Sequence, residues 1–461
     1  MATVTASENP TEAIASYITT LGFDDLPAAA VENAKLAVLD TIGVTLAGSQ
    51  TETALQVQAF IAGSGAAGAS TLLGSALRTS PELAALGNGV AAHVLDFDDR
   101  WHSSTHTLPA ALALAELHDL TGRDLLIAYV IGREVRLHFD AEFRAGRGGE
   151  VDSEGRRGPG WRGWHETGVF GSLGAVAAAS KILSLDVHQT QMALGIAASL
   201  ASGLMANFGT STKSLHAGNA ARNGVLAASL ASSGFTADPD ILGARRGLIE
   251  AITYPEDRSA ASIAKSLQEN LLIVEKGVRI KPYPSCTGTH QFIEMMRLLI
   301  REHEIKPDDI EKMTISRIEG ATTKREFPTT ELECRFSPAF VAVATLIDGK
   351  LTLQNCTLKF LQRPDVQDLL SRTQYVDAEV GFIDVHTSDG RTLSQSTIAT
   401  RHQGGSPAFD LEDEDEISAK FHDCSDPVIG EVRSRRLEAM LWDLEDVGSI
   451  RELTELMTIG G

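Results

Sequence analysis

Charged and hydrogen-bonding residues crowd into the stretch from His93 to His106, which holds three aspartates, three histidines and an arginine. Each charged group withdrawn from water costs free energy unless it is paired or hydrogen-bonded, so a segment built only for the core would avoid such residues. Taken alone, the stretch is typical of a solvated loop before a helix. Three further stretches of the same character favour a chemical site.

His165 is the centre of the second polar stretch, where a segment rich in glycine and arginine, Arg144 to Gly163, meets an alanine-rich helical pattern. We expect that segment to be mobile, and an imidazole at its end is well placed at the mouth of a cleft. A structural histidine is the alternative. The glycines at 168, 171 and 174 fit neither a dinucleotide nor a phosphate loop, so we expect them to permit close helix packing.

Lys213 and His216 lie near the expected start of a helix in the third stretch, after the hydroxyl-rich Thr210-Ser-Thr212. Free backbone N–H groups at a helix start, together with hydroxyls and a lysine, suit a carboxylate ligand. The alternative is a capped helix with a surface lysine.

Lys281 opens the fourth stretch, in which two prolines stiffen the chain before Ser285, Cys286 and His290. A lysine on a proline-fixed segment is a good anchor for an anion. A lone Lys-Pro pair is weak evidence, however, and Cys286 would serve equally as a small buried residue.

Composition narrows the class of protein. The chain has 461 residues, 43% of them hydrophobic and 22% charged, which is enough for a large core in one to three domains. The formal net charge of −21 and the absence of a Lys/Arg-rich run argue against a nucleic acid partner. The four cysteines are far apart and show no zinc-like spacing, and no signal peptide or membrane-spanning run is evident. These features predict a cytoplasmic globular protein without a membrane partner.

The spacing of apolar residues along the chain changes twice. From Thr11 to about Ser266 apolar residues recur at helical spacing, whereas from about 271 to 400 short β-like runs alternate with helices. Helical pattern returns after the acidic segment that opens at Asp410, which we interpret as an ordinary helix start. The β-like runs are Lys276 to Ile280, Ile310 to Ile318 and Val376 to Val385, the last followed by a turn at Ser388-Asp-Gly390.

Together the four stretches resemble the MmgE/PrpD family, which includes 2-methylcitrate dehydratase, cis-aconitate decarboxylase and iminodisuccinate epimerase. The resemblance spans nearly the whole chain and depends on three motifs in order. These are Leu95-Asp-Phe-Asp-Asp99 with a following histidine and Pro109-Ala-Ala-Leu, Lys213-Ser-Leu-His-Ala-Gly-Asn-Ala-Ala221, and Lys281-Pro-Tyr-Pro-Ser-Cys286.

The resemblance implies a mainly α fold, with a helical domain of residues 1–270 and 401–461 and an inserted α/β lid domain of residues 271–400. It also implies a homodimer with neither metal nor organic cofactor, and an active-site cleft between the two domains. The catalytic residues that it implies are Asp96, His106, His165, Lys213 and Lys281. The residues that we expect to bind substrate are Arg100, His102, His216, Ser285, Cys286 and Thr322. Arg100 stands where the family often has threonine, and Thr322 near an aromatic hydroxyl of the decarboxylase-like members.

The chemistry that the resemblance implies is proton transfer at a carbon next to a carboxylate, and it explains these residue types. Such a step builds negative charge, which Lys213 and Lys281 would stabilise. His106 and His165 are the candidate acid and base, with Asp96 orienting one of them. We therefore predict a cofactor-independent lyase of a small di- or tricarboxylate, like cis-aconitate decarboxylase or 2-methylcitrate dehydratase. An iminodisuccinate-type epimerase, a non-catalytic carboxylate-binding protein and a metal-dependent hydro-lyase are the alternatives.

Overall fold

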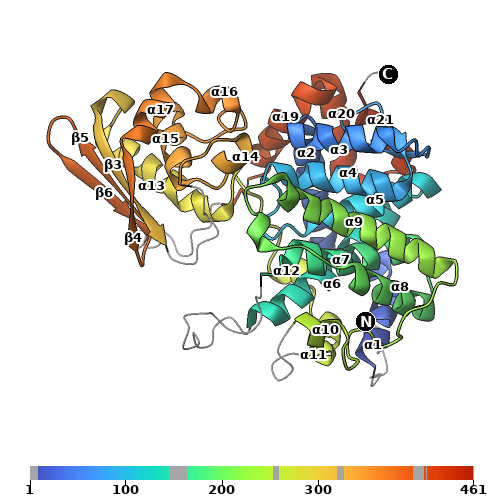
Figure 1. The fold of residues 1–461 in the computed structure, drawn as a ribbon. Helices are drawn as coiled ribbons and strands as arrows, with labels where there is room; N and C mark the ends of the chain where they lie inside the picture. The colour runs from blue at the N-terminus through green and yellow to red at the C-terminus, as the bar shows by residue number, and fades with distance from the viewer. Residues whose placement is uncertain are drawn as a thin grey trace.

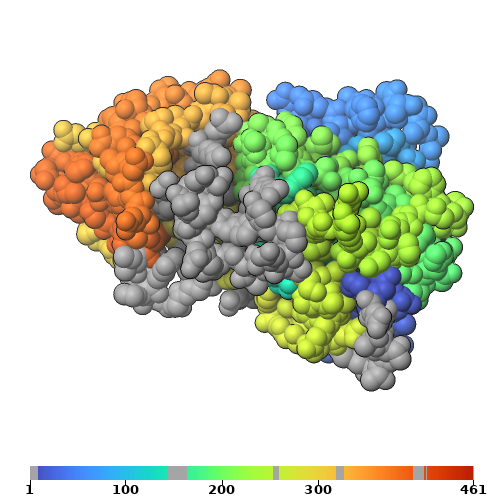
Figure 2. Space-filling view, turned by 60° about the horizontal axis from the view of Figure 1, so that its bottom comes forward, coloured from blue at the N-terminus to red at the C-terminus, as the bar shows by residue number. Residues whose placement is uncertain are grey.

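The computed structural model describes residues 9–145, 163–252, 259–318, 326–397, 410–411 and 413–459. Helices from both ends of the chain form one body, and the middle of the chain forms a smaller lobe beside it (Figure 1). Figure 2 shows the same lobe, in yellow and orange, on one side of the helical body. Thr322 and residues 146–162 of the segment expected to be mobile lie outside the described residues. The predicted mainly α fold with a smaller α/β part is confirmed.

The helical body holds the longer buried core, which runs from Ala13 to Ile280 and resumes from Ile417 to Met457. A small antiparallel pair, β1 (Ser70–Thr71) and β2 (Arg78–Thr79), lies at its edge. Its helices are α1 (Pro10–Thr20), α2 (Ala28–Ser49), α3 (Glu52–Gly63), α4 (Pro81–Val94), α5 (Ser104–His118), α6 (Gly122–Ala145), α7 (Glu166–Ile182), α8 (Val187–Leu200), α9 (Ser211–Ser232), α10 (Leu248–Ile252), α11 (Ala260–Glu269), α12 (Leu272–Glu275), α19 (Glu414–Ile429), α20 (Glu431–Trp442) and α21 (Ile450–Leu456).

The smaller lobe has its own core, from Tyr283 to Leu393, between a sheet and the helices on one of its faces. The sheet order is β4-β3-β5-β6, with β3 parallel to β4 and antiparallel to β5. Its elements are α13 (Thr287–His303), β3 (Ile310–Ile318), α14 (Glu331–Cys334), α15 (Pro338–Asp348), α16 (Leu358–Leu361), α17 (Pro364–Ser371), β4 (Thr373–Ala378), β5 (Phe382–Thr387) and β6 (Thr392–Ser396). The predicted domain limits at 270/271 and 400/401 stay a prediction.

Two of the expected strands differ from the structure. The prediction of a strand from Lys276 to Ile280 was wrong, because Ile280 makes a single bridge, with Leu411, and residues 276–279 form no regular structure. A strand needs a partner along its length, and among the described residues only Leu411 pairs with this segment. The run from Val376 to Val385 is divided between β4 and β5, whereas the strand from Ile310 to Ile318 is confirmed.

Small residues let the helices that carry the site approach closely. A Cβ atom on Gly174 of α7 would lie 2.7 Å from the backbone oxygen of Gly132 in α6, and one on Gly89 of α4 would lie 2.8 Å from the Cα of Gly218 in α9. Gly171 is crowded by the His106 ring of α5, whereas Gly168 faces the backbone of Ser202 after α8, so the predicted helix-packing role is confirmed for Gly171 and Gly174. The close contacts fix α4, α7 and α9 against one another and thereby position the polar residues at their ends.

Candidate active site

The loop between α4 and α5, residues 95–103, presents the acidic residues of the site. Asp96 and His102 adopt left-handed backbone conformations, with φ of 51° and 56°, which non-glycine residues seldom adopt. Asp99 fastens the loop, because its carboxylate accepts hydrogen bonds from the backbone N–H and hydroxyl groups of Ser103 and Ser104. The unusual backbone conformation is therefore held by buried hydrogen bonds, as expected at a functional site.

Asp96 joins two lysines from distant parts of the chain. Lys213 Nζ lies 2.5 Å from Asp96 Oδ2 and Lys281 Nζ lies 2.6 Å from Asp96 Oδ1, and all three residues are buried. Burial alone would raise the pKa of Asp96, but the two lysines more than offset it and hold the pKa well below its usual value. Asp96 therefore neutralises only part of the charge of the two ammonium groups.

Lys213 lies where the helical body and the smaller lobe meet. Its ammonium group is 5.5 Å from the ring centroid of Phe208, which precedes α9, and 5.3 Å from that of Phe336, which precedes α15. Aromatic faces attract a cation and exclude water around it. The two lobes therefore enclose this lysine together.

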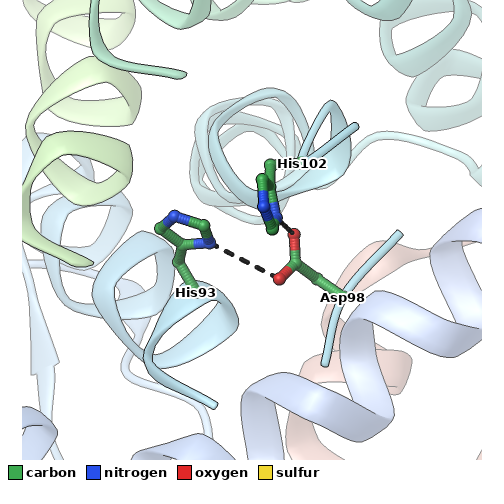
Figure 3. Close-up of side chains that lie close together, drawn as sticks. All are labelled: His93, Asp98 and His102. Atoms are coloured by element: carbon green, nitrogen blue, oxygen red, sulfur yellow. Dashed lines mark hydrogen bonds and ion pairs between the residues drawn. The ribbon is translucent and has the colours of Figure 1, made fainter. Parts of the chain in front are cut away.

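Two imidazoles turn toward a second carboxylate, Asp98 (Figure 3). His102 Nδ1 lies 2.6 Å from Asp98 Oδ2, and His93 Nδ1, at the end of α4, lies 3.4 Å from Asp98 Oδ1. His102 Nε2 is 3.7 Å from Asp96 Oδ1, so this ring connects the two carboxylates. Burial and the charges of Lys213 and His102 lower the pKa of His93 to about 3, which keeps that ring neutral.

His93, Asp98 and His102 also offer ligand atoms that all lie within 4.8 Å of one another, a donor set that suits zinc or iron. In the structure both oxygens of Asp98 already accept hydrogen bonds from the two imidazoles. The arrangement is therefore that of a hydrogen-bonded pair of imidazoles on one carboxylate. A metal ion would have to replace both of those hydrogen bonds.

His165 lies across the site and pairs with another imidazole. It precedes α7, its Nδ1 atom is 2.9 Å from Nδ1 of His216 on α9, and its ring stacks on His93 with centroids 6.2 Å apart. Burial and the charge of Lys213 lower the pKa of His165 well below its ordinary value. The ring is therefore neutral at rest and able to accept a proton.

His106 lies deeper, on α5, where its ring fills the space left by Gly171 of α7. Its Nδ1 atom is 3.0 Å from the hydroxyl of Thr107, and its buried Nε2 atom has no hydrogen-bond partner among the described residues. Burial and the charge of Arg136 lower the pKa of His106 well below its ordinary value. Among the described residues, His106 makes no hydrogen bond or ion pair with Asp96. His102 is the histidine that lies beside that carboxylate.

Two known protein domains match most of this chain. Residues 12–260 match the MmgE/PrpD N-terminal domain and residues 283–446 match the MmgE/PrpD C-terminal domain. The chain belongs to the MmgE/PrpD family. The resemblance predicted from the four polar stretches is thus confirmed, and the boundary between the two matches falls where the two cores meet.

Several relatives that match most of this chain are named cis-aconitate decarboxylase. The cis-aconitate decarboxylase of Mus musculus is 31% identical over 97% of this chain and 93% of its own, and that of Homo sapiens is 33% identical over 79% and 76%. The cis-aconitate decarboxylase of Aspergillus terreus is 24% identical over 98% of this chain and 96% of its own. Membership and these relatives identify the chain as a lyase of the decarboxylase or dehydratase type, as predicted. No helix within the described residues is long and apolar enough to cross a membrane.

Arg100, the residue that departs from the family pattern, forms an ion pair within the protein. Its guanidinium lies 2.8 Å from Asp410, which also accepts a hydrogen bond from Arg279 at 2.6 Å, and the backbone N–H of Arg100 donates to the oxygen of Arg279. These contacts tie the 95–103 loop to the segments that connect the two lobes. The predicted role of Arg100 in substrate binding stays a prediction.

The fourth polar stretch lies beside Lys281. Ser285 is buried and accepts a hydrogen bond from the hydroxyl of Thr289, while Cys286 precedes α13. Burial and the charge of Asp96 raise the pKa of the Cys286 thiol, so it is not an activated nucleophile. His290 points its Nε2 atom at the backbone oxygen of Ser285.

Four residues of the site were missed as candidates from the sequence. His93 and Asp98 lie within the first polar stretch, so their crowding was a usable signal, whereas Asp410 was interpreted as part of an ordinary helix start. Lys420 gave no signal. It lies on α19, pairs with Asp40 at 2.6 Å and donates to the backbone oxygens of Phe97 and Lys281.

Proposed function

We propose that this protein is a cofactor-independent decarboxylase of a small unsaturated tricarboxylate of the cis-aconitate kind. The observation that carries the proposal is the meeting of Lys213 and Lys281 on Asp96, next to the imidazoles of His102 and His165. The names of the relatives support the choice of substrate.

The lysines would stabilise the charge that the reaction builds. When a proton reaches carbon next to a carboxylate, or leaves it, negative charge accumulates on that carboxylate in the transition state. Ammonium groups that are already in place and shielded from water lower this barrier without reorganisation. Lys213 and Lys281 meet both conditions, because they are buried and Asp96 holds them.

Decarboxylation of cis-aconitate is balanced by one proton. In cis-aconitate one carboxylate is attached to a CH₂ group next to the C=C bond. Its bond to that carbon breaks, CO₂ leaves, and the electron pair forms a new C=C bond. The former double-bond pair takes a proton at the carbon next to another carboxylate, so the product is methylenesuccinate. The protein must supply one proton and cations, and no electrons are exchanged.

The proton would come from an imidazole. A carboxylate hydrogen-bonded to Nδ1 stabilises an imidazolium, and Asp98 holds Nδ1 of His102 in this way, leaving Nε2 toward Asp96 and the lysines. His165 would serve as the second acid or base. His106 was predicted as an acid or base. We propose that it binds the substrate instead, because its buried Nε2 atom has no hydrogen-bond partner among the described residues and a bound carboxylate would supply one.

The test is incubation of the purified protein in deuterated water with cis-aconitate, citrate, 2-methylcitrate and iminodisuccinate in turn, followed by NMR. The expected product is methylenesuccinate with one deuterium in its saturated CH₂ group, with release of CO₂. Loss of water from 2-methylcitrate would overturn the proposal in favour of a dehydratase, and deuterium exchange without a product in favour of an epimerase. The predicted homodimer and cytoplasmic location stay predictions.

A further inference from the structure

We propose that His216 is the positioning residue of His165, and that the two imidazoles share one proton between their Nδ1 atoms. The inference rests on the proposed function, in which His165 is an acid or base. It concerns the His165 and His216 pair, which lies apart from the ion pairs of Asp96 with the two lysines.

The geometry of the pair carries the proposal. The two Nδ1 atoms are 2.9 Å apart, which is a hydrogen-bond distance between nitrogen atoms. Because two lone pairs would repel at this distance, one Nδ1 must carry a proton and the other must accept it. The pair therefore fixes which nitrogen of each ring faces outward.

The backbone around the pair holds both rings. The backbone N–H of His165 donates to the oxygen of Gly203 at 3.0 Å, and the Cβ position of Gly203, whose φ is 129°, lies 3.2 Å from the ring of His216. A side chain at residue 203 would be strained and would push against that ring. One loop residue thus fixes the backbone of the first histidine and leaves space for the ring of the second.

Among the described residues no carboxylate is hydrogen-bonded to the ring of His165, so His216 occupies the place that an aspartate takes beside many catalytic histidines. A neutral imidazole does not hold a permanent charge there. His165 can become an imidazolium when a bound polycarboxylate offsets the nearby charge of Lys213. Asp96 already neutralises part of the charge of Lys213.

The proton step balances within the pair. In the charged form Nε2 of His165 carries the proton for carbon, and its Nδ1–H donates to the lone pair of Nδ1 in His216. When the Nε2–H bond breaks and a C–H bond forms, the pair returns to neutral and keeps the shared proton. Water then restores the proton at Nε2. The small exposure of His216, 8% against 2% for His165, places it on the outer side of the pair.

The test compares His216→Phe, which keeps a ring but removes both nitrogens, with His216→Asn, whose amide can still bond to Nδ1 of His165. The matched control is His188→Asn on the exposed side of α8. We expect His216→Phe to lower kcat about tenfold to a hundredfold with little change in KM, and His216→Asn to recover most of it. The inference is overturned if His216→Phe is as active as wild type. It is also overturned if His216→Phe and His216→Asn both fold and lose kcat equally.

A second readout does not depend on turnover. The shared proton should give a downfield imidazole N–H resonance in the nitrogen-15-labelled full chain, present in wild type and His188→Asn and absent in His216→Phe. Lack of that resonance in wild type overturns the inference. A wild-type chain that shows it, yet converts none of the four acids, overturns the proposed function alone.

Discussion

Lys281 donates to two oxygens of Asp96, the backbone oxygen at 2.9 Å and carboxylate Oδ1 at 2.6 Å, although 185 residues separate the two in sequence. The segment that enters the smaller lobe is thereby tied to the loop between α4 and α5. Since Lys281 is fully buried, this contact stabilises the fold as well as setting the charge of the site.

Replacing Lys281 with methionine should therefore lower both stability and activity. Removal of one partner of a buried ion pair costs about 3–5 kcal/mol, and we expect the lower end because Lys213 still pairs with Asp96. Urea unfolding measures the loss. The double variant with Asp96→Asn should lose less unfolding free energy than the sum of the losses in the two single variants. A loss equal to that sum would argue against the pairing.

Each histidine of the site can be tested by substitution with asparagine. We expect His102→Asn and His165→Asn to lower kcat about 10²- to 10⁴-fold, the usual contribution of a general acid or base, while the protein stays folded. Steady-state kinetics and circular dichroism check this. Unchanged turnover in both variants would exclude these two histidines from the proton transfer, whereas a wild type that binds the ligand without turnover would be a non-catalytic carboxylate-binding protein.

His106→Asn tests whether the buried Nε2 atom meets the substrate. If it does, kcat/KM falls, because the substrate carboxylate loses a partner. Kinetics with cis-aconitate give the answer. A variant with lower thermal stability and unchanged kcat/KM would restrict His106 to packing against Gly171.

Arg100→Ala distinguishes a structural from a binding role. Because Asp410 already pairs with Arg100 and Arg279, we expect the melting temperature to fall while KM changes less than twofold. Thermal unfolding and kinetics are the measurements, with the exposed Arg391→Ala as control. A raised KM with an unchanged melting temperature would instead support the sequence-based prediction of substrate binding.

Stability should fall on acidification, and His93 contributes to that fall. Its pKa is about 3 in the folded protein and about 6.5 unfolded, so the unfolded chain binds more protons between these values and is favoured as pH drops. From pH 6.5 to pH 5 this amounts to about 2 kcal/mol, at 1.36 kcal/mol per pKa unit.

Asp40 acts in the opposite direction, because burial raises its pKa to about 6 and its folded carboxyl group takes up a proton first. The comparison of wild type with His93→Asn at pH 7 and pH 5 cancels that contribution. We expect the variant to lose about 2 kcal/mol less than wild type on acidification. Equal losses would mean that His93 does not titrate as described.

Exhaustive chelation should leave turnover unchanged. The His93, Asp98 and His102 cluster has its carboxylate oxygens occupied by the two imidazoles, so the proposed proton transfer uses it without an ion. Activity after dialysis against a chelator, compared with a mock-dialysed sample, decides the matter. Loss of activity that added zinc or iron restores would make the cluster a metal site.

Much of this protein was predictable from local sequence. Apolar spacing predicted the helices, since helical periodicity is a property of neighbouring residues, and β3 was predicted with its observed limits. Ordered motifs predicted the family and named Asp96, Lys213 and Lys281, which the structure brings together.

Only the tertiary structure decided which imidazoles meet those residues. The left-handed backbone at Asp96 and His102 turns His102 toward the carboxylate, while the phase of α5 directs His106 against α7. Likewise Asp410 reaches Arg100 from 310 residues away. Such pairings depend on how loops and helices pack in space, and spacing along a chain carries no information about that packing.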